Sequence, residues 1–286
     1  MAAASLLRRL LLAAMTVLAG GLISATLARY APGFGMDERQ LDARLSSASL
    51  EALRQTTAEE RGIVSYYVKA LGRAVRGDLG VSRSLERPIR ELLAERAGVT
   101  CRLAARAMLL AWGAALLLLS GSWLLRVPAV STGATLLSGA LLCLPAGALA
   151  LLSVVLNAPG YLALALVLYP KIHRYLNSMI AGAAAMPHVI TARAKGISQF
   201  RILLWHVLPV VRREILALLG VSVGLAISAA IPIEALCGIA GIGQLAWQSA
   251  LARDLPLLIN LSMLVIAAVT LANGGADLLS GERRPA

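Results

Sequence analysis

The chain has 286 residues, of which 58% are hydrophobic, and its mean hydropathy is +0.76. Soluble domains are usually about 45–50% apolar, so this composition excludes an ordinary soluble domain and indicates a membrane protein. The net charge of +12 is scattered between long uncharged runs and forms no dense basic block, which argues against a nucleic-acid partner. The three cysteines are widely spaced and include no CxxC pair, so they support neither a disulfide framework nor a metal site.

Six stretches are apolar enough to cross a bilayer, for which a helix needs about 20 residues. They cover about Leu10–Leu27, Leu103–Leu125, Thr132–Leu156, Tyr161–Ala181, Ile215–Ile233 and Leu255–Leu279. The first run is longer than the apolar part of a signal peptide and lacks a clear cleavage site, so we expect it to stay as a span. The fourth is the weakest, and we expect its Lys171, His173 and Arg174 to lie toward the cytoplasmic interface. The predicted fold is therefore all-α and polytopic, with six transmembrane helices.

The short basic segments all fall on one side of these six spans. They contain Arg8, Arg9, Arg126, Arg193, Lys195, Arg201, Arg212, Arg213, Arg283 and Arg284. Short loops rich in Lys and Arg stay in the cytoplasm, so this side and both termini are predicted to be cytoplasmic, in a bacterial inner membrane. We divide the chain into a first transmembrane helix (1–28), a periplasmic loop with short helices (29–102) and a core of five transmembrane helices (103–286). Glu234, at the outer end of the fifth span, is interpreted as an interface anchor.

The connection between the fourth and fifth spans, residues 185–212, carries the most informative pattern. It predicts a short helix over Val189–Lys195, a break at Gly196, and an amphipathic helix that ends at Pro209. The residues singled out are Thr191, Ala192, Arg193, Ala194, Lys195, Gly196, Ile197 and Pro209. Read alone, this is a basic cytoplasmic loop of a kind that many membrane proteins have.

These residues resemble the EAA loop of permeases in the dipeptide/oligopeptide/nickel family of binding-protein-dependent ABC importers. The first glutamate of the general motif is replaced by Thr191. Two further stretches resemble the same family in the same order: Leu71–Ser82 followed by Arg87–Ile89 and Leu92–Arg96, and Glu234–Leu245 followed by Ala252–Pro256. The resemblance is poor between about Ala111 and Lys171, and Ala240 stands where the family usually has proline.

The resemblance implies the type I importer permease (MetI-like) fold and a subunit that forms the translocation pathway for small peptides. Its implied partners are cytoplasmic ATPase subunits, a second permease, a periplasmic substrate-binding protein and membrane lipid. The 185–212 loop would contain the coupling helix that docks on the ATPase. A bulky residue at Gly196 or a charge at Ala192 is therefore expected to block uptake, because each change falls on the coupling helix. No G-x-x-x-x-G-K-[ST] occurs, so ATP would be bound by a partner chain and no cofactor is expected here.

Other functions remain as alternatives. An intramembrane enzyme would need clustered catalytic groups, and no G-x-S-x-G, H-E-x-x-H or paired aspartate motif occurs in any span. A self-contained carrier would need an internal repeat, which is not evident. A divergent orphan permease, or an importer of nickel, glutathione or oligosaccharide, also remains open.

Small residues recur every four positions in the fifth span, at Gly220, Gly224 and Ser228. This spacing puts them on one helix face, where a second helix can approach closely. The partner helix could belong to this chain or to a second permease.

Overall fold

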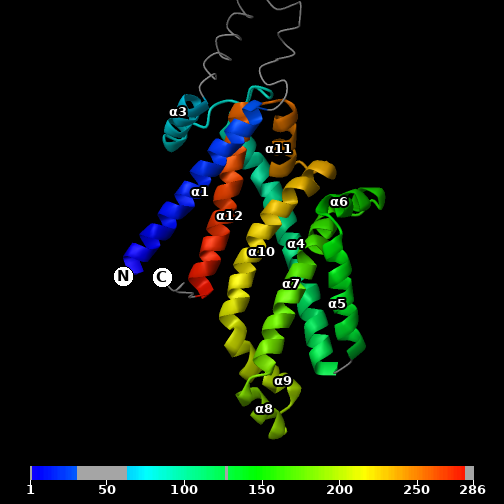
Figure 1. Ribbon diagram of the computed structural model, residues 1–286. Helices are drawn as coiled ribbons and strands as arrows, with labels where there is room; N and C mark the ends of the chain where they lie inside the picture. Colours follow the sequence, from blue (N-terminus) through cyan, green and yellow to red (C-terminus); the bar gives the residue numbers. More distant parts are fainter. Residues whose placement is uncertain (1, 31–62, 126–127, 281–286) are drawn as a thin grey trace, which may run out of the picture. The chain divides into compact units, whose positions relative to one another are not determined.

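The computed structural model describes residues 2–30, 63–125 and 128–280, which are almost entirely helical (Figure 1). The predicted basic positions Arg126, Arg283 and Arg284, and much of the predicted periplasmic loop, lie outside the described residues. The helices are α1 (Ala2–Tyr30), α3 (Ile63–Val75), α4 (Ile89–Leu125), α5 (Pro128–Cys143), α6 (Ala146–Val155), α7 (Gly160–Ala184), α8 (Pro187–Ala194), α9 (Gln199–Ile202), the π-helical turn η2 (Leu203–Val207), α10 (Leu208–Leu236), α11 (Ile242–Leu251) and α12 (Leu255–Ser280).

The chain forms two compact units, each of which is described by itself. Unit 1 contains residues 1–97 and 245–267, and unit 2 contains residues 98–244 and 268–286. Three helices, α4, α11 and α12, contribute residues to both units.

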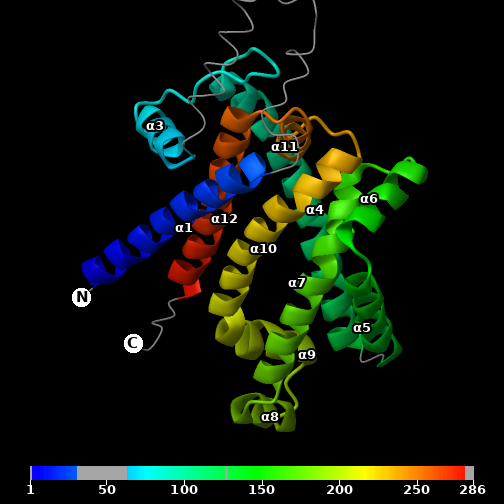
Figure 2. The same cartoon turned by 45° about the horizontal axis from the view of Figure 1, so that its top comes forward.

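Unit 1 is built where α3 packs beside α1 and the first turns of α12 (Figure 2). Its apolar centre contains Ala25, Tyr67, Leu255 and Ile259. The Tyr67 hydroxyl donates a hydrogen bond to the Leu18 carbonyl at 2.8 Å. Burial raises the pKa of Tyr67, so its hydroxyl stays protonated and remains a donor at neutral pH.

Unit 2 is arranged around α7. Its apolar core takes buried side chains from α4, α6, α7 and α10, among them Ala111, Leu149, Leu168, Ile172 and Leu218. The helices α8 and α9 lie at one end of α7 and α10, and α6 lies at the other end (Figures 1 and 2). This arrangement sets the 185–212 loop apart from the apolar core.

Among the described residues, four helices are long and apolar enough to cross a membrane: Leu7–Leu27, Ile89–Trp123, Gln199–Leu236 and Leu255–Ala276. They correspond to the predicted first, second, fifth and sixth spans. The predicted fourth span corresponds to α7, which is 25 residues long but is not among these four because of its charged middle. The count of six spans therefore stays a prediction.

The predicted third span, Thr132–Leu156, is wrong as one continuous helix. The chain is helical over α5 and again over α6, but the two helices are bent by 97° at a short break. Pro145 stands at that break in an extended conformation (φ −66°, ψ 146°). A proline lacks the N–H needed inside a helix and disfavours helical geometry in the residue before it, so α5 ends there.

The expected interfacial position of His173 is also wrong. Its side chain is 3% exposed, and Nδ1 lies 3.0 Å from the Ser138 hydroxyl of α5. The His173 ring also stacks on Tyr169, with ring centroids 5.4 Å apart. Because these groups give the imidazole partners inside the unit, it can stay in the core instead of reaching for water.

Candidate functional site

The coupling hairpin, which we define as residues 187–207, contains α8, a tight turn, α9 and η2. Pro187 occupies the first turn of α8, where its missing N–H is not needed. The helix ends with paired hydrogen bonds: Gly196 N–H donates to the Arg193 carbonyl at 3.0 Å and Ile197 N–H to the Ala192 carbonyl at 3.3 Å. This is a Schellman cap, and Gly196 has the positive φ of 75° that the cap requires. The predicted break at Gly196 is confirmed.

The predicted amphipathic helix does not end at Pro209. The four residues of α9 lead through η2 directly into α10, which begins at Leu208 and includes Pro209 in its first turn. A proline is tolerated in a first turn, so it marks the start of α10 and not the end of the preceding helix. A single π turn of this kind often occurs at functional sites.

The hairpin has a small apolar core of its own. Val189 and Ala192 of α8 pack with Ile202 and Val207 and with Val211 at the start of α10. Met179, Ile180 and Ala183 at the end of α7 also belong to this cluster. The hairpin is thus a folded projection fixed to α7 and α10, which is what a rigid docking element needs.

The predicted coupling residues divide by burial. Ala192 is 4% exposed and Ile197 is half-buried, whereas the others lie exposed: Thr191, Arg193, Ala194, Lys195, Gly196 and Pro209. A charge at Ala192 would therefore act first on the core of the hairpin and not on its outer surface. Two large apolar side chains that the sequence did not single out, Ile190 and Phe200, are 56% and 58% exposed.

The small residues of α10 face the C-terminal part of α12 within unit 2. A methyl group added at Gly220 would lie 2.6 Å from the Ala276 Cβ, and one added at Gly224 would lie 2.9 Å from the Asn273 side-chain oxygen. Ser228 is exposed, and its hydroxyl donates to the Gly224 carbonyl. Gly220 and Gly224 therefore allow close approach of a helix from the same chain.

In unit 1, the second and third stretches that resemble the family meet at Asp254. This carboxylate is 1% exposed. Its Oδ2 accepts hydrogen bonds from the Ser82 hydroxyl at 2.6 Å and from the Ser84 N–H and hydroxyl at 3.0 and 2.9 Å. Its Oδ1 accepts from Leu257 N–H at 3.1 Å and so caps α12. No local pattern could reveal this contact, because Ser82 and Asp254 are 172 residues apart.

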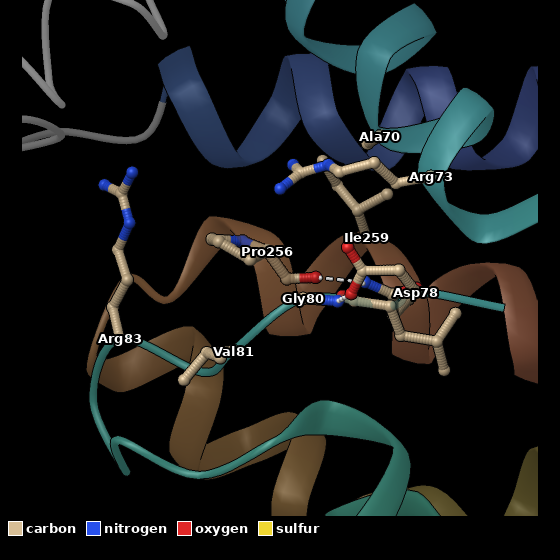
Figure 3. Close-up of a pocket in the computed structure, with 10 residues that line it drawn as sticks. Ala70, Arg73, Asp78, Gly80, Val81, Arg83, Pro256 and Ile259 are labelled. Atoms are coloured by element: carbon tan, nitrogen blue, oxygen red, sulfur yellow. Dashed lines mark hydrogen bonds between the residues drawn. The ribbon is translucent and has the colours of Figure 1, made fainter. Parts of the chain in front are cut away.

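A cavity of about 210 Å³ lies beside this junction, between α3, the 78–83 segment and α12 (Figure 3). Asn260 forms part of its wall and donates its amide to the Leu79 carbonyl at 3.2 Å. Arg73 and Asp78 also line the cavity, and Asp78 accepts a hydrogen bond from Gly80 N–H. No group of three or more possible metal ligands occurs among the residues that the structure describes.

Glu234 is not an interface anchor, because its side chain is 0% exposed. Gly243 N–H donates to its Oε2 at 2.6 Å, and Gly241 lies so close to the carboxylate that a larger residue would collide with it. Gly243 itself lies against the α10 backbone, where an added Cβ would be 2.5 Å from the Ile231 carbonyl oxygen. The two glycines let the turn after α10 fold back over the buried carboxylate.

Comparisons with known proteins agree with the resemblance seen in the sequence. The family described as "Binding-protein-dependent transport system inner membrane component" matches residues 105–280, which is more than half of the chain and includes the stretch where the sequence resemblance was poor. A Brucella ovis protein named "Putative peptide permease protein" is 28% identical over 305 residues, covering 95% of each chain. The oligopeptide transport system permease protein OppB of Escherichia coli K12 is 32% identical over 117 residues, covering 41% of this chain and 38% of OppB. The di/tripeptide transport system permease protein DppB of Pseudomonas aeruginosa is 32% identical over 114 residues, covering 40% of this chain and 34% of DppB.

Proposed function

Because the chain belongs to the family of binding-protein-dependent transport system inner membrane components, we propose that it forms the pathway of an ATP-driven importer for small peptides. The family and the apolar helices show a multi-pass permease subunit of the inner membrane. The peptide cargo is inferred from similar proteins named as peptide, oligopeptide and di/tripeptide permeases. One similar protein is named a glutathione permease, so glutathione is the second candidate.

The coupling hairpin supports this proposal most strongly, because it is a folded projection that exposes the large apolar side chains of Ile190 and Phe200. In the proposal, Ile190, Ala194 and the neighbouring exposed residues dock in a groove of a cytoplasmic ATPase subunit. The hairpin side and both termini then face the cytoplasm. A second permease, a periplasmic substrate-binding protein and membrane lipid complete the assembly, and this chain needs no cofactor because ATP is bound by the partner.

The docking surface is tested by charging an exposed hairpin position. We expect Ile190→Glu, and to a lesser degree Ala194→Glu, to lose the co-purifying ATPase while the chain stays folded, because a charge replaces apolar contact area. Val81→Glu is the matched control, since Val81 is also 56% exposed but lies in unit 1. Ala192→Glu is expected to lose the ATPase together with thermal stability, because it places a charge in the hairpin core. Retention of the ATPase by Ile190→Glu at wild-type yield would contradict this docking surface.

The cargo is tested by uptake into proteoliposomes that contain this chain with its co-purified partners and the binding protein. Labelled dipeptides and tripeptides, glutathione, nickel and a short oligosaccharide are compared at equal concentration with and without ATP. The proposal requires ATP-dependent uptake of the peptides. Uptake of nickel, glutathione or oligosaccharide in their absence would replace peptide as the cargo and leave the permease assignment unchanged.

A further inference from the structure

Trp123, near the C-terminal end of α4, contacts both limbs of the coupling hairpin. Its ring lies beneath the Arg193 guanidinium of α8, with the Cζ atom 5.2 Å from the ring centroid. Its Nε1–H donates to the Gln199 carbonyl of α9 at 3.4 Å. The ring also packs against the apolar core of the hairpin. One side chain therefore joins α4 to the residues on either side of the Gly196 turn.

The connection matters because of how the hairpin is attached. Along the chain, the hairpin continues directly only into α7 and α10. No peptide segment joins it to α4, so within unit 2 a displacement of the hairpin reaches α4 only through packing and contacts such as those of Trp123. Tryptophan is the ring that attracts a cation most strongly, and arginine is the cation found most often over such a ring.

The rest of α4 is suited to pass such a displacement on. It is one helix of 37 residues, and Trp123 is only two residues from its end. At Thr100, within the same unit, the hydroxyl accepts a hydrogen bond from Ile242 N–H at 2.9 Å, next to the turn that covers Glu234. A rigid helix with polar contacts at separated points can carry a change between them.

We propose that Trp123 is a positioning residue that makes α4 follow the coupling hairpin when the ATPase moves it. This inference rests on the proposed docking function and adds α4 to the helices that respond directly, beside α7 and α10. Trp123 does not take part in docking itself. Its side chain holds the hairpin and α4 at one separation in every state of the transport cycle.

The test uses the whole importer, reconstituted with its binding protein and a dipeptide. Four variants are compared with wild type: Trp123→Leu removes the ring and its N–H, Trp123→Phe keeps a ring for Arg193, Arg193→Ala removes the cation, and Trp247→Leu is the control. Trp247 lies in α11 and is 56% exposed. The quantities measured are bound ATPase, basal ATP hydrolysis, and cargo imported per ATP hydrolysed.

We expect Trp123→Leu to bind the ATPase and hydrolyse ATP as wild type does, but to import about fivefold less cargo per ATP or worse, while Trp123→Phe and Trp247→Leu stay within about twofold of wild type. Arg193→Ala should lower the ratio in wild type but add little in the Trp123→Leu background, because the contact is already gone. A wild-type ratio in Trp123→Leu would overturn the inference. Loss of the ATPase from that variant would also overturn it, since Trp123 would then only shape the docking surface.

A distance measurement distinguishes a Trp123 that transmits movement of the hairpin to α4 from a Trp123 that only stabilises the hairpin. In a cysteine-free background, spin labels at Ser120 of α4 and at Leu204 in the η2 turn of the hairpin, which is 40% exposed, should keep one distance with and without ATP. In Trp123→Leu that distance should change with nucleotide, and a constant distance would contradict the inference. If the wild-type chain binds no ATPase at all, the proposed function fails instead, which is a different and recognisable result.

Discussion

Replacing Asp254 with alanine should destabilise unit 1 far more than an ordinary surface change. The carboxylate is the acceptor for two backbone N–H groups, of Ser84 and Leu257, and for the hydroxyls of Ser82 and Ser84. In the variant, both N–H groups and the buried Ser82 hydroxyl lose their acceptor. A buried donor without a partner costs about 1–3 kcal/mol, and such costs do not add fully, so we expect a loss of about 3–5 kcal/mol.

The matched control is Asp78→Ala, which removes a carboxylate from the loop between α3 and α4 that Asp254 holds. Asp78 is exposed and accepts one described hydrogen bond, from Gly80 N–H at 2.9 Å, so its loss should cost about 1 kcal/mol or less. For a chain of this size about 1 kcal/mol corresponds to roughly 2–4 °C, so the melting temperature should fall by about 6–20 °C in Asp254→Ala and by no more than about 4 °C in the control. The fall in melting temperature of Asp254→Asn should lie between those of the two alanine variants. An amide keeps one acceptor oxygen but turns a donor toward Ser84 N–H.

Two assays read this prediction in the purified protein. The melting temperature in detergent reports the whole chain, and the rate of trypsin cleavage after the exposed residue Arg83 reports the loop that Asp254 holds. Both should respond in Asp254→Ala. Equal melting temperatures and equal cleavage rates in Asp254→Ala and Asp78→Ala would refute the view that this carboxylate fixes the loop to α12.

Two further predictions concern glycines. Gly220→Leu should lower the melting temperature by several degrees, because overpacking against Ala276 costs about 1–3 kcal/mol. Gly139→Leu should leave the melting temperature unchanged, because Gly139 has no neighbour within 4 Å. Equal effects of the two changes would argue against close packing of α10 on α12. Gly196→Val should lose the co-purifying ATPase, because a β-branched residue is strained at φ 75°. Gly182→Val should retain the ATPase, because Gly182 lies in open space on α7. Retention of the ATPase by Gly196→Val would mean that the Schellman turn is not needed for docking.

The sequence predicted those features that depend on local composition or on motifs. Four spans follow from runs of apolar residues, and the end of α8 follows from a glycine after a short helical pattern. The bend at Pro145 was missed because an average over an apolar run does not register one proline, although proline itself is the signal that could have revealed it. The π turn before Pro209 was missed because Pro209 was interpreted as a helix end, whereas it lies in a first turn.

Features that depend on distant contacts could not be predicted. Asp254 reads as an ordinary helix cap, and only the fold brings Ser82 and Ser84 to it. His173 reads as an interfacial charge until Ser138 is placed beside its ring. Ala192 lies within a polar, basic segment, and nothing in that segment shows that its methyl group points into the hairpin core.

The length of α4 has a consequence for where lipid ends and water begins. At about 1.5 Å per residue, its 37 residues extend for about 55 Å, whereas the hydrocarbon layer is only about 30 Å thick. Nearly half of the helix must therefore lie outside the hydrocarbon layer, or the helix must cross that layer at a steep tilt. Its first turns carry Arg90, Glu91, Glu95 and Arg96, and the uncharged run begins only after Arg106. The surface of the hydrocarbon layer should consequently meet this helix near Arg102–Arg106. Fluorophores attached at successive positions along α4 would locate that surface, because quenchers placed at known depths in the lipid reach only the fluorophores at the same depth.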